Sequence, residues 1–338
     1  MTLLVTGGCG FIGSEIIRQA VNQGRNVLNI DALTYAANQN NLDSIKHLSN
    51  YEFKHLDICD RVSLEKVFSQ YQPLSVIHCA AESHVDRSIN SPDKFIYTNV
   101  IGTFNLLETA KKYKCKFLHI STDEVYGDLQ ETDPAFTEKN LIAPSSPYSA
   151  SKAASDHLVR AWGKTYGLPF LISNCSNNYG PYQYPEKLIP VVILACLQER
   201  KIPIYGEGKN IRDWLYVSDH VKAILKILDE GVIGETYNIG GGNELTNIEL
   251  VNMICEIMDK NYPRSNGKYS NLINFVKDRN GHDRRYAVNA TKIKSELGWK
   301  PSVSIKQGLE ITIDWYFKNK KWWMPIQIDN NKFYKKNS

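Results

Sequence analysis

Three glycines near the N-terminus constrain this chain more than any other feature. Gly7, Gly10 and Gly13 follow a short apolar run at residues 3–5 and precede a stretch with helical character at residues 14–23. A glycine-rich turn between a strand and a helix lets the backbone approach a pyrophosphate closely. The pattern therefore predicts a dinucleotide-binding unit at the start of the chain.

An acidic residue at the end of the next predicted strand strengthens this interpretation. Asp31 ends the strand predicted at residues 27–31, about 20 residues beyond the glycines. A carboxylate at this place can accept hydrogen bonds from both ribose hydroxyls of adenosine, and its charge disfavours a 2′-phosphate. The sequence therefore favours NAD over NADP. The amides near Phe11 and Ile12 are expected to bind the phosphate oxygens.

Short apolar runs alternate with periodic stretches along the first half of the chain. The apolar runs are at residues 52–55, 75–79, 116–121 and 169–174, and the periodic stretches at residues 63–71, 93–113 and 149–166. Strands alternating with helices predict an α/β fold, a Rossmann-type doubly wound parallel sheet with helices on both faces.

Prolines and glycines become frequent after residue 179, which predicts a smaller C-terminal substrate-binding domain. We expect residues 1–178 to form the NAD-binding domain and residues 179–320 to form the smaller, discontinuous one. The chain is expected to return to the first domain near residues 213–240 and 304–320. Residues 321–338 show neither a helical nor a strand period and are expected to form a tail.

Composition excludes several other classes of protein. The net charge is only +4, and basic residues cluster only near the C-terminus, so no nucleic-acid partner is expected. No apolar run is long enough to span a membrane, and because the glycine-rich turn begins so early we expect no signal peptide. The seven cysteines are scattered and lack a Cys-x-x-Cys spacing, which indicates reduced thiols, a cytoplasmic protein and no metal site.

A tyrosine and a lysine supply the first part of a chemical site. Tyr148 and Lys152 are four residues apart and therefore share one face of a helix. A nearby ammonium lowers the pKa of a tyrosine, because it favours the phenolate. Tyr148 can then remove a hydroxyl proton while a hydride leaves the same carbon for NAD, and Lys152 can bind the nicotinamide ribose.

Two neighbouring carboxyl groups supply the second part. Thr122, Asp123 and Glu124 follow the strand predicted at residues 116–121, and the carboxyl ends of parallel strands line the ligand crevice. Two carboxyl groups in one site tend to acquire separated pKa values, so one can donate a proton while the other removes one. Thr122 can hydrogen-bond the reacting oxygen.

The ends of two other predicted strands complete the expected cofactor site. Asp57 and Ile58 follow the third strand and can frame the adenine. Ala80, Ala81 and Ser83 follow the fourth strand, where small side chains let a dinucleotide lie close to the backbone.

The chain resembles the nucleotide-sugar 4,6-dehydratases of the extended short-chain dehydrogenase/reductase superfamily. The resemblance is carried by residues 6–14, 80–88, 121–128, 144–153 and 174–181, among others. It implies an NAD-dependent carbon–oxygen lyase that oxidises C4 of a nucleoside-diphosphate glucose, eliminates water across C5 and C6, and returns the hydride to C6. The favoured substrate is dTDP-glucose, with UDP-glucose second, since one methyl group is worth only about 1–3 kcal/mol.

The resemblance also implies a role for each residue of the site. Asp123 protonates the leaving hydroxyl at C6, Glu124 removes the C5 proton, and Tyr148 is the base at C4, assisted by Thr122 and Lys152. Further implied cofactor contacts are Leu33, Thr34, Thr98 and Asn178. The implied substrate contacts are Ser83, Thr122, Asn177, Lys187, Leu188, Pro203, Tyr205, Arg212, Asn247, Arg279 and His282.

Two other functions stay open at this stage. A nucleotide-sugar 4-epimerase needs Tyr148, Lys152 and NAD but no acid and base for elimination, so Asp123 and Glu124 argue against it. A catalytically silent NAD-binding regulator needs none of these four side chains. The resemblance further implies a homodimer, with helices at residues 93–113 and 148–166 at its interface.

Overall fold

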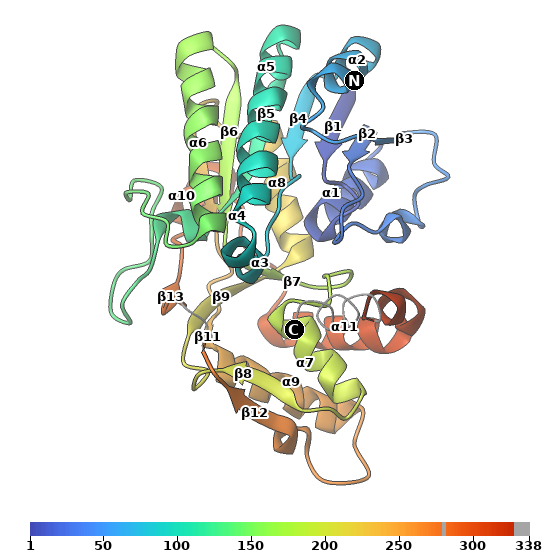
Figure 1. Ribbon diagram of the computed structural model, residues 1–338, viewed down its shortest axis with the longest axis vertical. Helices are drawn as coiled ribbons and strands as arrows, with labels where there is room; N and C mark the ends of the chain where they lie inside the picture. The colour runs from blue at the N-terminus through green and yellow to red at the C-terminus, as the bar shows by residue number, and fades with distance from the viewer. Residues whose placement is uncertain (279–281, 328–338) are drawn as a thin grey trace.

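A seven-stranded parallel sheet forms the centre of the protein. The structure is a computed structural model that describes residues 1–278 and 282–327 (Figure 1). The strand order is β10-β6-β5-β4-β1-β2-β3. The strands are β1 (Thr2–Thr6), β2 (Asn26–Asp31), β3 (Tyr51–His55), β4 (Ser75–His78), β5 (Lys116–Thr122), β6 (Phe170–Cys175) and β10 (Thr236–Ile239). The predicted doubly wound fold is confirmed, and its order reverses between β1 and β4, where such sheets bind ligands.

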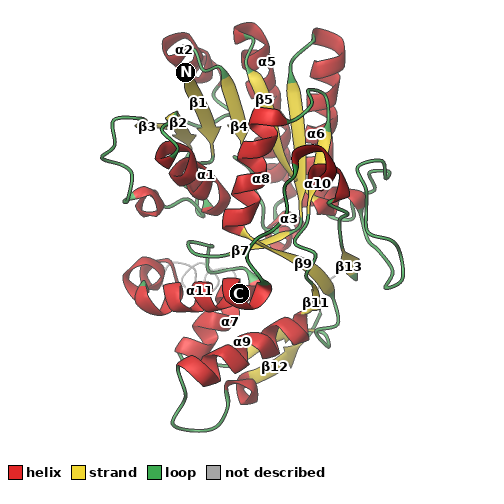
Figure 2. Cartoon of the chain, turned by 180° about the vertical axis from the view of Figure 1, so that it is seen from behind, coloured by secondary structure: helices red, strands yellow, loops and turns green. Residues whose placement is uncertain are grey.

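Helices cover both faces of this sheet, as Figures 1 and 2 show from opposite sides. Leu3 and Val5 of β1 pack in one core with α1 (Phe11–Asn22) and α8 (Val217–Glu230). Leu4, which points to the opposite face, packs in a second core with residues of three further helices. These helices are α2 (Arg61–Tyr71), α5 (Thr103–Tyr113) and α6 (Pro147–Tyr166).

The helix predicted at residues 93–113 is divided in the structure. It consists of α4 (Pro92–Phe95), a π-helical segment η2 (Ile96–Gly102) and α5, and the short helix α3 (Val85–Asn90) precedes it. The wider π-helical turn places Asn99 inside the protein, where its side chain bonds both backbone groups of Glu82. The segment therefore ties the loop after β4 to the helical layer.

A smaller lobe lies beyond the carboxyl ends of the strands. Its elements are β7 (Asn177–Tyr179), β8 (Ile202–Tyr205), β9 (Ile211–Tyr216), β11 (Glu244–Thr246), β12 (Ile273–Val276), β13 (Arg285–Tyr286), α7 (Leu188–Leu197), α9 (Asn247–Asn261) and α11 (Ile305–Lys318). The remaining short elements are η1 (Gln39–Leu42), η3 (Asp123–Tyr126), η4 (Tyr269–Leu272) and α10 (Thr291–Leu297). Apolar residues of α7, α9 and α11 form the core of this lobe.

The return of the chain to the first sheet differs in part from the prediction. Helix α8 and strand β10 do return, but β9 pairs with β7, β11 and β13 in the smaller lobe. The prediction for residues 304–320 is wrong, because Leu309, Ile313 and Tyr316 of α11 are buried in the core of the smaller lobe. The helix that packs against α8 and β10 is instead α10.

The beginning of the expected tail is also structured. Residues 320–327 are helical, and Trp323 is buried and donates its indole N–H to the carbonyl of Tyr316 at 2.8 Å. The indole of Trp322 donates to Asn41 Oδ1 at 2.8 Å, across to the first lobe. Within residues 1–278 and 282–327, no helix is long and apolar enough to cross a membrane.

Candidate active site

A cleft of about 380 Å³ lies between the carboxyl ends of the strands and the smaller lobe. Most of the predicted cofactor residues line it: Gly7, Gly10, Phe11, Ile12, Gly13, Asp31, Thr34, Asp57, Ile58, Ala80, Ala81, Ser83, Thr98, Tyr148, Lys152 and Asn178. Thr122, Asp123, Glu124, Asn177, Lys187 and Leu188 line the same cleft. Residues that are distant in the sequence therefore share one cavity.

The glycine-rich turn has the geometry that a pyrophosphate site requires. Gly7 has a φ of +68°, and a Cβ at Gly13 would lie 2.2 Å from the carbonyl oxygen of Gly7. Gly10 caps α1 without any side-chain hydrogen bond, so the first amides of this helix stay available to a ligand. The helix N-terminus also favours negative charge. These features fit a bound dinucleotide.

Asp31 is held in place by the backbone around it. Its carboxylate accepts hydrogen bonds from the amides of Cys9 at 2.9 Å and Leu33 at 2.8 Å. Burial raises the pKa of Asp31, and these two amide bonds oppose the rise. Leu33 itself is not among the residues that line the cleft; its backbone, at a φ of 52°, supplies the second amide. Leu33 thus helps to orient Asp31 through its backbone amide, and it is not itself part of the cleft wall.

The two neighbouring carboxyl groups lie where β5 ends. Thr122 caps the short helix η3, and its Oγ1 accepts from the amide of Glu124 at 3.3 Å. Asp123 is 2% exposed, and burial together with the charges of Glu124 and Asp213 raises its pKa well above the ordinary value. The raised pKa favours the protonated form of Asp123, which suits a group that donates a proton.

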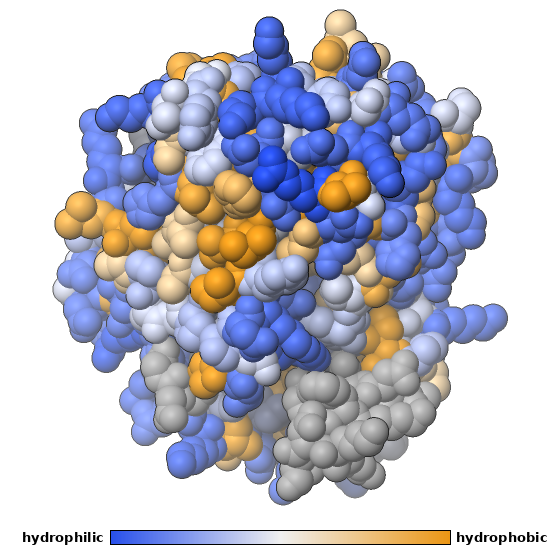
Figure 3. All heavy atoms as spheres, turned by 45° about the horizontal axis from the view of Figure 1, so that its top comes forward, coloured by the Kyte–Doolittle hydropathy of each residue, from blue (hydrophilic) through white to orange (hydrophobic). Residues whose placement is uncertain are grey.

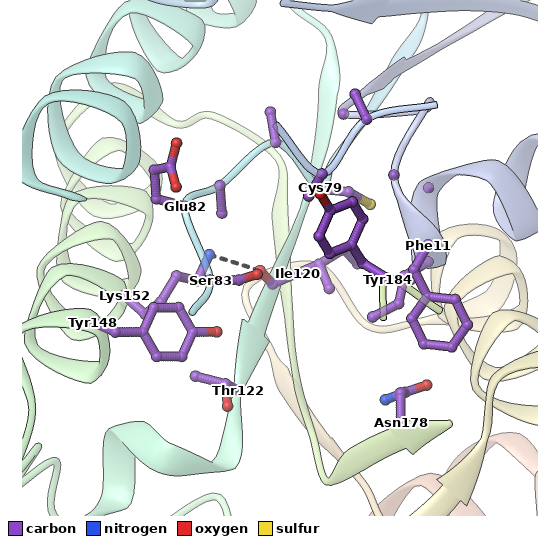
Figure 4. A pocket seen from close by; sticks show the side chains of 18 of the residues that line it. Phe11, Cys79, Glu82, Ser83, Ile120, Thr122, Tyr148, Lys152, Asn178 and Tyr184 are labelled. Atoms are coloured by element: carbon purple, nitrogen blue, oxygen red, sulfur yellow. Dashed lines mark hydrogen bonds between the residues drawn. The ribbon is translucent and has the colours of Figure 1, made fainter. Parts of the chain in front are cut away.

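Tyr148 and Lys152 reach the cleft from the first two turns of α6 (Figure 4). Pro147 starts this helix, and Ser146 and Ser149 form a reciprocal capping box. The ring of Tyr148 packs edge-on against Phe95 at a centroid distance of 6.2 Å. The cap therefore fixes the helix end that presents both side chains.

The expected lowering of the Tyr148 pKa is not found. Burial, followed by the charge of Glu124, raises the pKa of Tyr148 well above its ordinary value. Lys152 Nζ is directed to the carbonyl of Ile120 at 2.8 Å, as the dashed line in Figure 4 marks. Desolvation of the phenol therefore outweighs the hydrogen bond with Thr122, which acts in the opposite direction.

The sequence pattern missed a loop of the smaller lobe that closes one side of the cleft. Tyr184 and Glu186 line the cleft, and Glu186 accepts a hydrogen bond from the hydroxyl of Tyr35 at 3.0 Å. The next residue, Lys187, donates to the carbonyl of Ser83 at 3.0 Å. The loop lies in a proline-rich segment without periodicity, so only the contact of Lys187 and its neighbour Leu188 was predicted.

The sequence pattern also missed other residues that line the cleft: Ala32, Ala36, Ala37, Leu56, Cys79, Glu82, Ile120, Ser121, Cys175, Ser176, Gln183 and Trp214. They are ordinary core or loop residue types, and only their position next to the ends of strands or in cleft loops distinguishes them.

Several predicted substrate residues do not line this cleft. Pro203, Tyr205, Arg212, Asn247 and His282 belong to the smaller lobe but are absent from the cleft wall, and Arg279 lies outside the described residues. Arg212 is buried and donates to the backbone carbonyl of Asp283 at 2.9 Å. Its charge still lowers the pKa of Asp123, so it lies near the acid. Tyr205 and His282 pack edge-on at a centroid distance of 6.3 Å.

No metal site accompanies these groups in the described ranges, since no set of His, Cys, Asp or Glu side chains there could hold an ion.

Known proteins with similar sequences and structures share this architecture. The chain is 54% identical over 338 residues to the dTDP-glucose 4,6-dehydratase of Neisseria meningitidis, which covers 96% of the chain and 95% of that relative. A dTDP-glucose 4,6-dehydratase from Bacillus anthracis, solved in complex with NAD, is 46% identical with a TM-score of 0.88, over 96% of this chain and 99% of that one. One from Streptomyces venezuelae, solved with NAD and dTDP bound, is 42% identical with a TM-score of 0.91, over 96% and 100%.

A family model described as GDP-mannose 4,6 dehydratase matches residues 4–312, nearly the whole described chain. Its match includes the glycine-rich turn, the carboxyl pair and the Tyr148–Lys152 pair. The chain therefore belongs to the GDP-mannose 4,6 dehydratase family, within the extended short-chain dehydrogenases/reductases.

Proposed function

We propose that this chain is an NAD-dependent dTDP-glucose 4,6-dehydratase, a carbon–oxygen lyase that yields the 4-keto-6-deoxy sugar. The observation that carries the proposal is the buried Asp123, with its raised pKa, beside Glu124 in the same cleft as Tyr148 and Lys152. An epimerase needs only the last two. Full-length relatives named dTDP-glucose 4,6-dehydratase support the thymidine nucleotide.

The first lobe would hold NAD along the edge of its sheet. The open amides of α1 suit the pyrophosphate, Asp31 suits the adenosine ribose, and Asp57 and Ile58, which line the cleft, would frame the adenine. When bound, NAD supplies the hydride acceptor for C4 and the donor for C6. Because the reaction regenerates the same NAD, the cofactor does not need to leave the cleft between turnovers.

The side chains divide the proton transfers between them. Tyr148, after it has lost its own proton, takes the proton of the C4 hydroxyl at its phenolate oxygen, while Thr122 bonds the same substrate oxygen. Glu124 then removes the C5 proton, which the adjacent ketone has made acidic. Asp123 gives its proton to the C6 hydroxyl, which leaves as water. Oxidation must come first, since an unoxidised sugar has no acidic C5 proton.

The direct test is incubation of the enzyme with dTDP-glucose and detection of the 4-keto product by its absorbance in alkali. In deuterated water, the product should carry solvent deuterium at C5, because Glu124 exchanges its proton with the solvent. A product that keeps its C6 hydroxyl and is inverted at C4 would make the enzyme an epimerase. Competition between dTDP-glucose and UDP-glucose measures the nucleotide preference.

Replacing Asp31 with Ala is expected to weaken NAD binding by about 10- to 100-fold, because charged hydrogen bonds contribute about 1.5–3 kcal/mol. The preference for NAD over NADP should shrink as well, since the charge that repels a 2′-phosphate is gone. Fluorescence titration with both cofactors measures the two affinities. Asp43→Ala, which removes an exposed carboxylate paired with Lys46, is the control. Equal NAD affinity in wild type and Asp31→Ala would contradict this assignment.

We also propose that the enzyme is a homodimer. Ile96, Tyr97 and Ile101 of η2 are between 41% and 58% exposed although they are large and apolar. Figure 3 shows apolar side chains gathered on the face over α5 and α6. Exposed apolar patches of this kind mark protein interfaces.

The expected mass in analytical ultracentrifugation is that of two chains, and Ile101→Lys is expected to shift the protein to single chains, because a buried unpaired ammonium opposes association. Ile311→Lys, on an equally exposed apolar side chain of α11, should leave the mass unchanged. A single-chain mass for the wild type would refute the dimer.

We further propose a cytoplasmic location, because all seven cysteines are free, five of them buried. Unpaired thiols are typical of proteins from reducing compartments.

A further inference from the structure

A group of buried polar side chains lies directly behind Lys152. His119 and Asp156 are each 0% exposed, and neither lines the cleft. Asp156 follows Lys152 by four residues on α6, and His119 lies on β5, so the two elements face each other here. Neither residue has a part in the proton transfers described above.

Lys152 and Asp156 both approach one nitrogen of His119. Lys152 Nζ lies 3.3 Å from His119 Nε2, which in turn lies 3.3 Å from Asp156 Oδ1. The other carboxyl oxygen of Asp156 accepts from Ser121 Oγ at 2.9 Å. Ser121 and His119 are two residues apart on β5, so both point to the same face, toward α6. Side chains on one face of α6 and on one face of β5 therefore meet behind Lys152.

A buried ammonium needs this kind of support. Burial lowers the pKa of Lys152, and the first influence that opposes the loss of its proton is the charge of Asp156. A buried charge without an opposite charge near it is strongly unfavourable. Among the charges that favour the protonated form of Lys152, that of Asp156 therefore has the largest effect.

The arrangement is poorly optimised for packing alone. In the described residues, His119 Nδ1 and Asp156 Oδ1 are buried without a hydrogen-bond partner. Such unsatisfied buried atoms cost stability, and native proteins keep them mainly where function requires it. Two apolar side chains would fill the same space without this cost.

We propose that Asp156 is the counter-ion that keeps Lys152 protonated and directed at the cleft, and that His119, whose Nε2 lies near both groups, helps to position the lysine. The inference rests on the proposed function, in which Lys152 assists Tyr148 in the oxidation at C4. His119 and Asp156 are positioning residues, because they act only through Lys152. His119 Nε2 accepts from the ammonium, and the carboxylate of Asp156, which lies 3.3 Å from the same nitrogen, stabilises the charge.

The charge of this cluster depends on pH through Asp156 and through the titratable groups that face it. These groups are His78 and Cys79 on the side of β4, Cys175 at the end of β6, Tyr126 in η3, and His157 and Arg160 on α6. Burial raises the pKa of Asp156 to about 6, so its charge is present above that pH and is lost as the pH falls through it. Burial holds His119 neutral, with its pKa well below the ordinary value.

The test compares Asp156→Asn with His119→Gln and a matched control, all as the NAD-bound enzyme. Lysine labelled with ¹³C at Cε reports protonation by NMR, and Lys152→Met identifies the signal. In Asp156→Asn, Lys152 is expected to lose its proton about 1 pH unit lower than in the wild type, because a charge at this distance shifts a pKa by that amount or more. The alkaline limb of product formation should move down in parallel.

The other two variants separate positioning from packing. His119→Gln keeps a neutral acceptor for Lys152 and leaves the charge of Asp156 in place, so the lysine should titrate as in the wild type. Asp219→Asn removes a carboxylate that is 1% exposed and bonds Ser302 and Val303 far from the cleft. It should lower the melting temperature without moving the lysine signal or the pH profile.

Unchanged lysine titration in Asp156→Asn, with only a lower melting temperature like that of Asp219→Asn, would overturn the inference. A lysine signal that moves equally in both aspartate variants would overturn it too, because loss of packing would then explain the shift. The NMR titration needs no substrate. Failure of the wild type to form a 4-keto sugar would therefore refute the proposed function while leaving this inference separately testable.

Discussion

Glu124→Gln is expected to stop the reaction after the oxidation at C4. The amide cannot remove the C5 proton, so formation of the 4-keto-6-deoxy product should fall by about 10²- to 10⁴-fold, the range for loss of a general base. Glu124 lines the cleft at the start of η3 and is partly exposed, so its replacement should disturb the fold little. In deuterated water, the 4-keto glucose recovered from this variant should carry no solvent deuterium at C5.

Asp123→Asn provides the matched comparison at the adjacent position. Here Glu124 still removes the C5 proton, but no acid protonates the leaving hydroxyl. Product formation should fall by a similar factor, whereas recovered 4-keto glucose should exchange its C5 proton with the solvent. Mass spectrometry of quenched reactions distinguishes the two patterns. If both variants exchange C5 equally, or if Glu124→Gln retains wild-type turnover, the proposed division into acid and base is wrong.

The burial of Asp123 explains why the two carboxyl groups can divide these roles. Its pKa is raised by desolvation first and by Glu124 second, so the charge of one group helps to keep the proton on the other. Thr122 Oγ1 lies 3.3 Å from Asp123 Oδ1 and also caps η3. The end of β5 thus fixes both carboxyl groups through one threonine. A solvated Asp-Glu turn would have none of this asymmetry.

Local patterns predicted the parts of the site that lie close together in the sequence. The glycine spacing and Asp31 describe a strand–turn–helix unit, and Tyr148 and Lys152 are one helical turn apart, so short-range geometry fixes each of them. The parallel sheet followed from the alternation of strands and helices. The order reversal then brings all of these strand ends to one cleft.

Long-range packing determined what the sequence pattern could not supply. Glu186 meets Tyr35 across 151 residues, and the indole of Trp322 meets Asn41 across 281. Nothing in the local spacing of these residues indicates a partner. Helix α11 was assigned to the wrong lobe for the same reason, since an amphipathic helix shows that it has an apolar face but not which core that face joins.

The raised pKa of Tyr148 was missed because spacing alone cannot reveal desolvation. The pairing with Lys152 suggested a lowered pKa, but the phenol is only 9% exposed and lies near Glu124. At neutral pH Tyr148 therefore carries its proton before substrate binds. Since it must lose that proton to act as the base at C4, product formation is expected to rise with pH until the alkaline limit that Lys152 sets.

Tyr148→Phe is expected to lower product formation by about 10²- to 10⁴-fold, because the C4 hydroxyl then has no base. The phenylalanine keeps the ring that packs edge-on against Phe95, so the melting temperature should change little. NAD affinity should stay close to that of the wild type, since Asp31 and the amides of α1 are untouched. The rate should also lose the rise with pH that ionisation of the phenol causes.

Alkaline absorbance of the 4-keto product, followed from pH 6 to pH 10, measures both effects, and fluorescence titration measures NAD. Tyr71→Phe, which removes a hydroxyl of α2 that donates to Glu52 and does not line the cleft, is the control and should leave rate and pH profile unchanged. Substrate affinity separates the causes of any loss. A variant that binds dTDP-glucose as tightly as the wild type but does not turn it over has lost the base. Turnover within a few-fold of the wild type would mean that another group removes the proton of the C4 hydroxyl. Glu124 is the candidate, because its charge acts on Tyr148 in the same cleft. The same carboxylate would then have to remove both the C4 hydroxyl proton and the C5 proton.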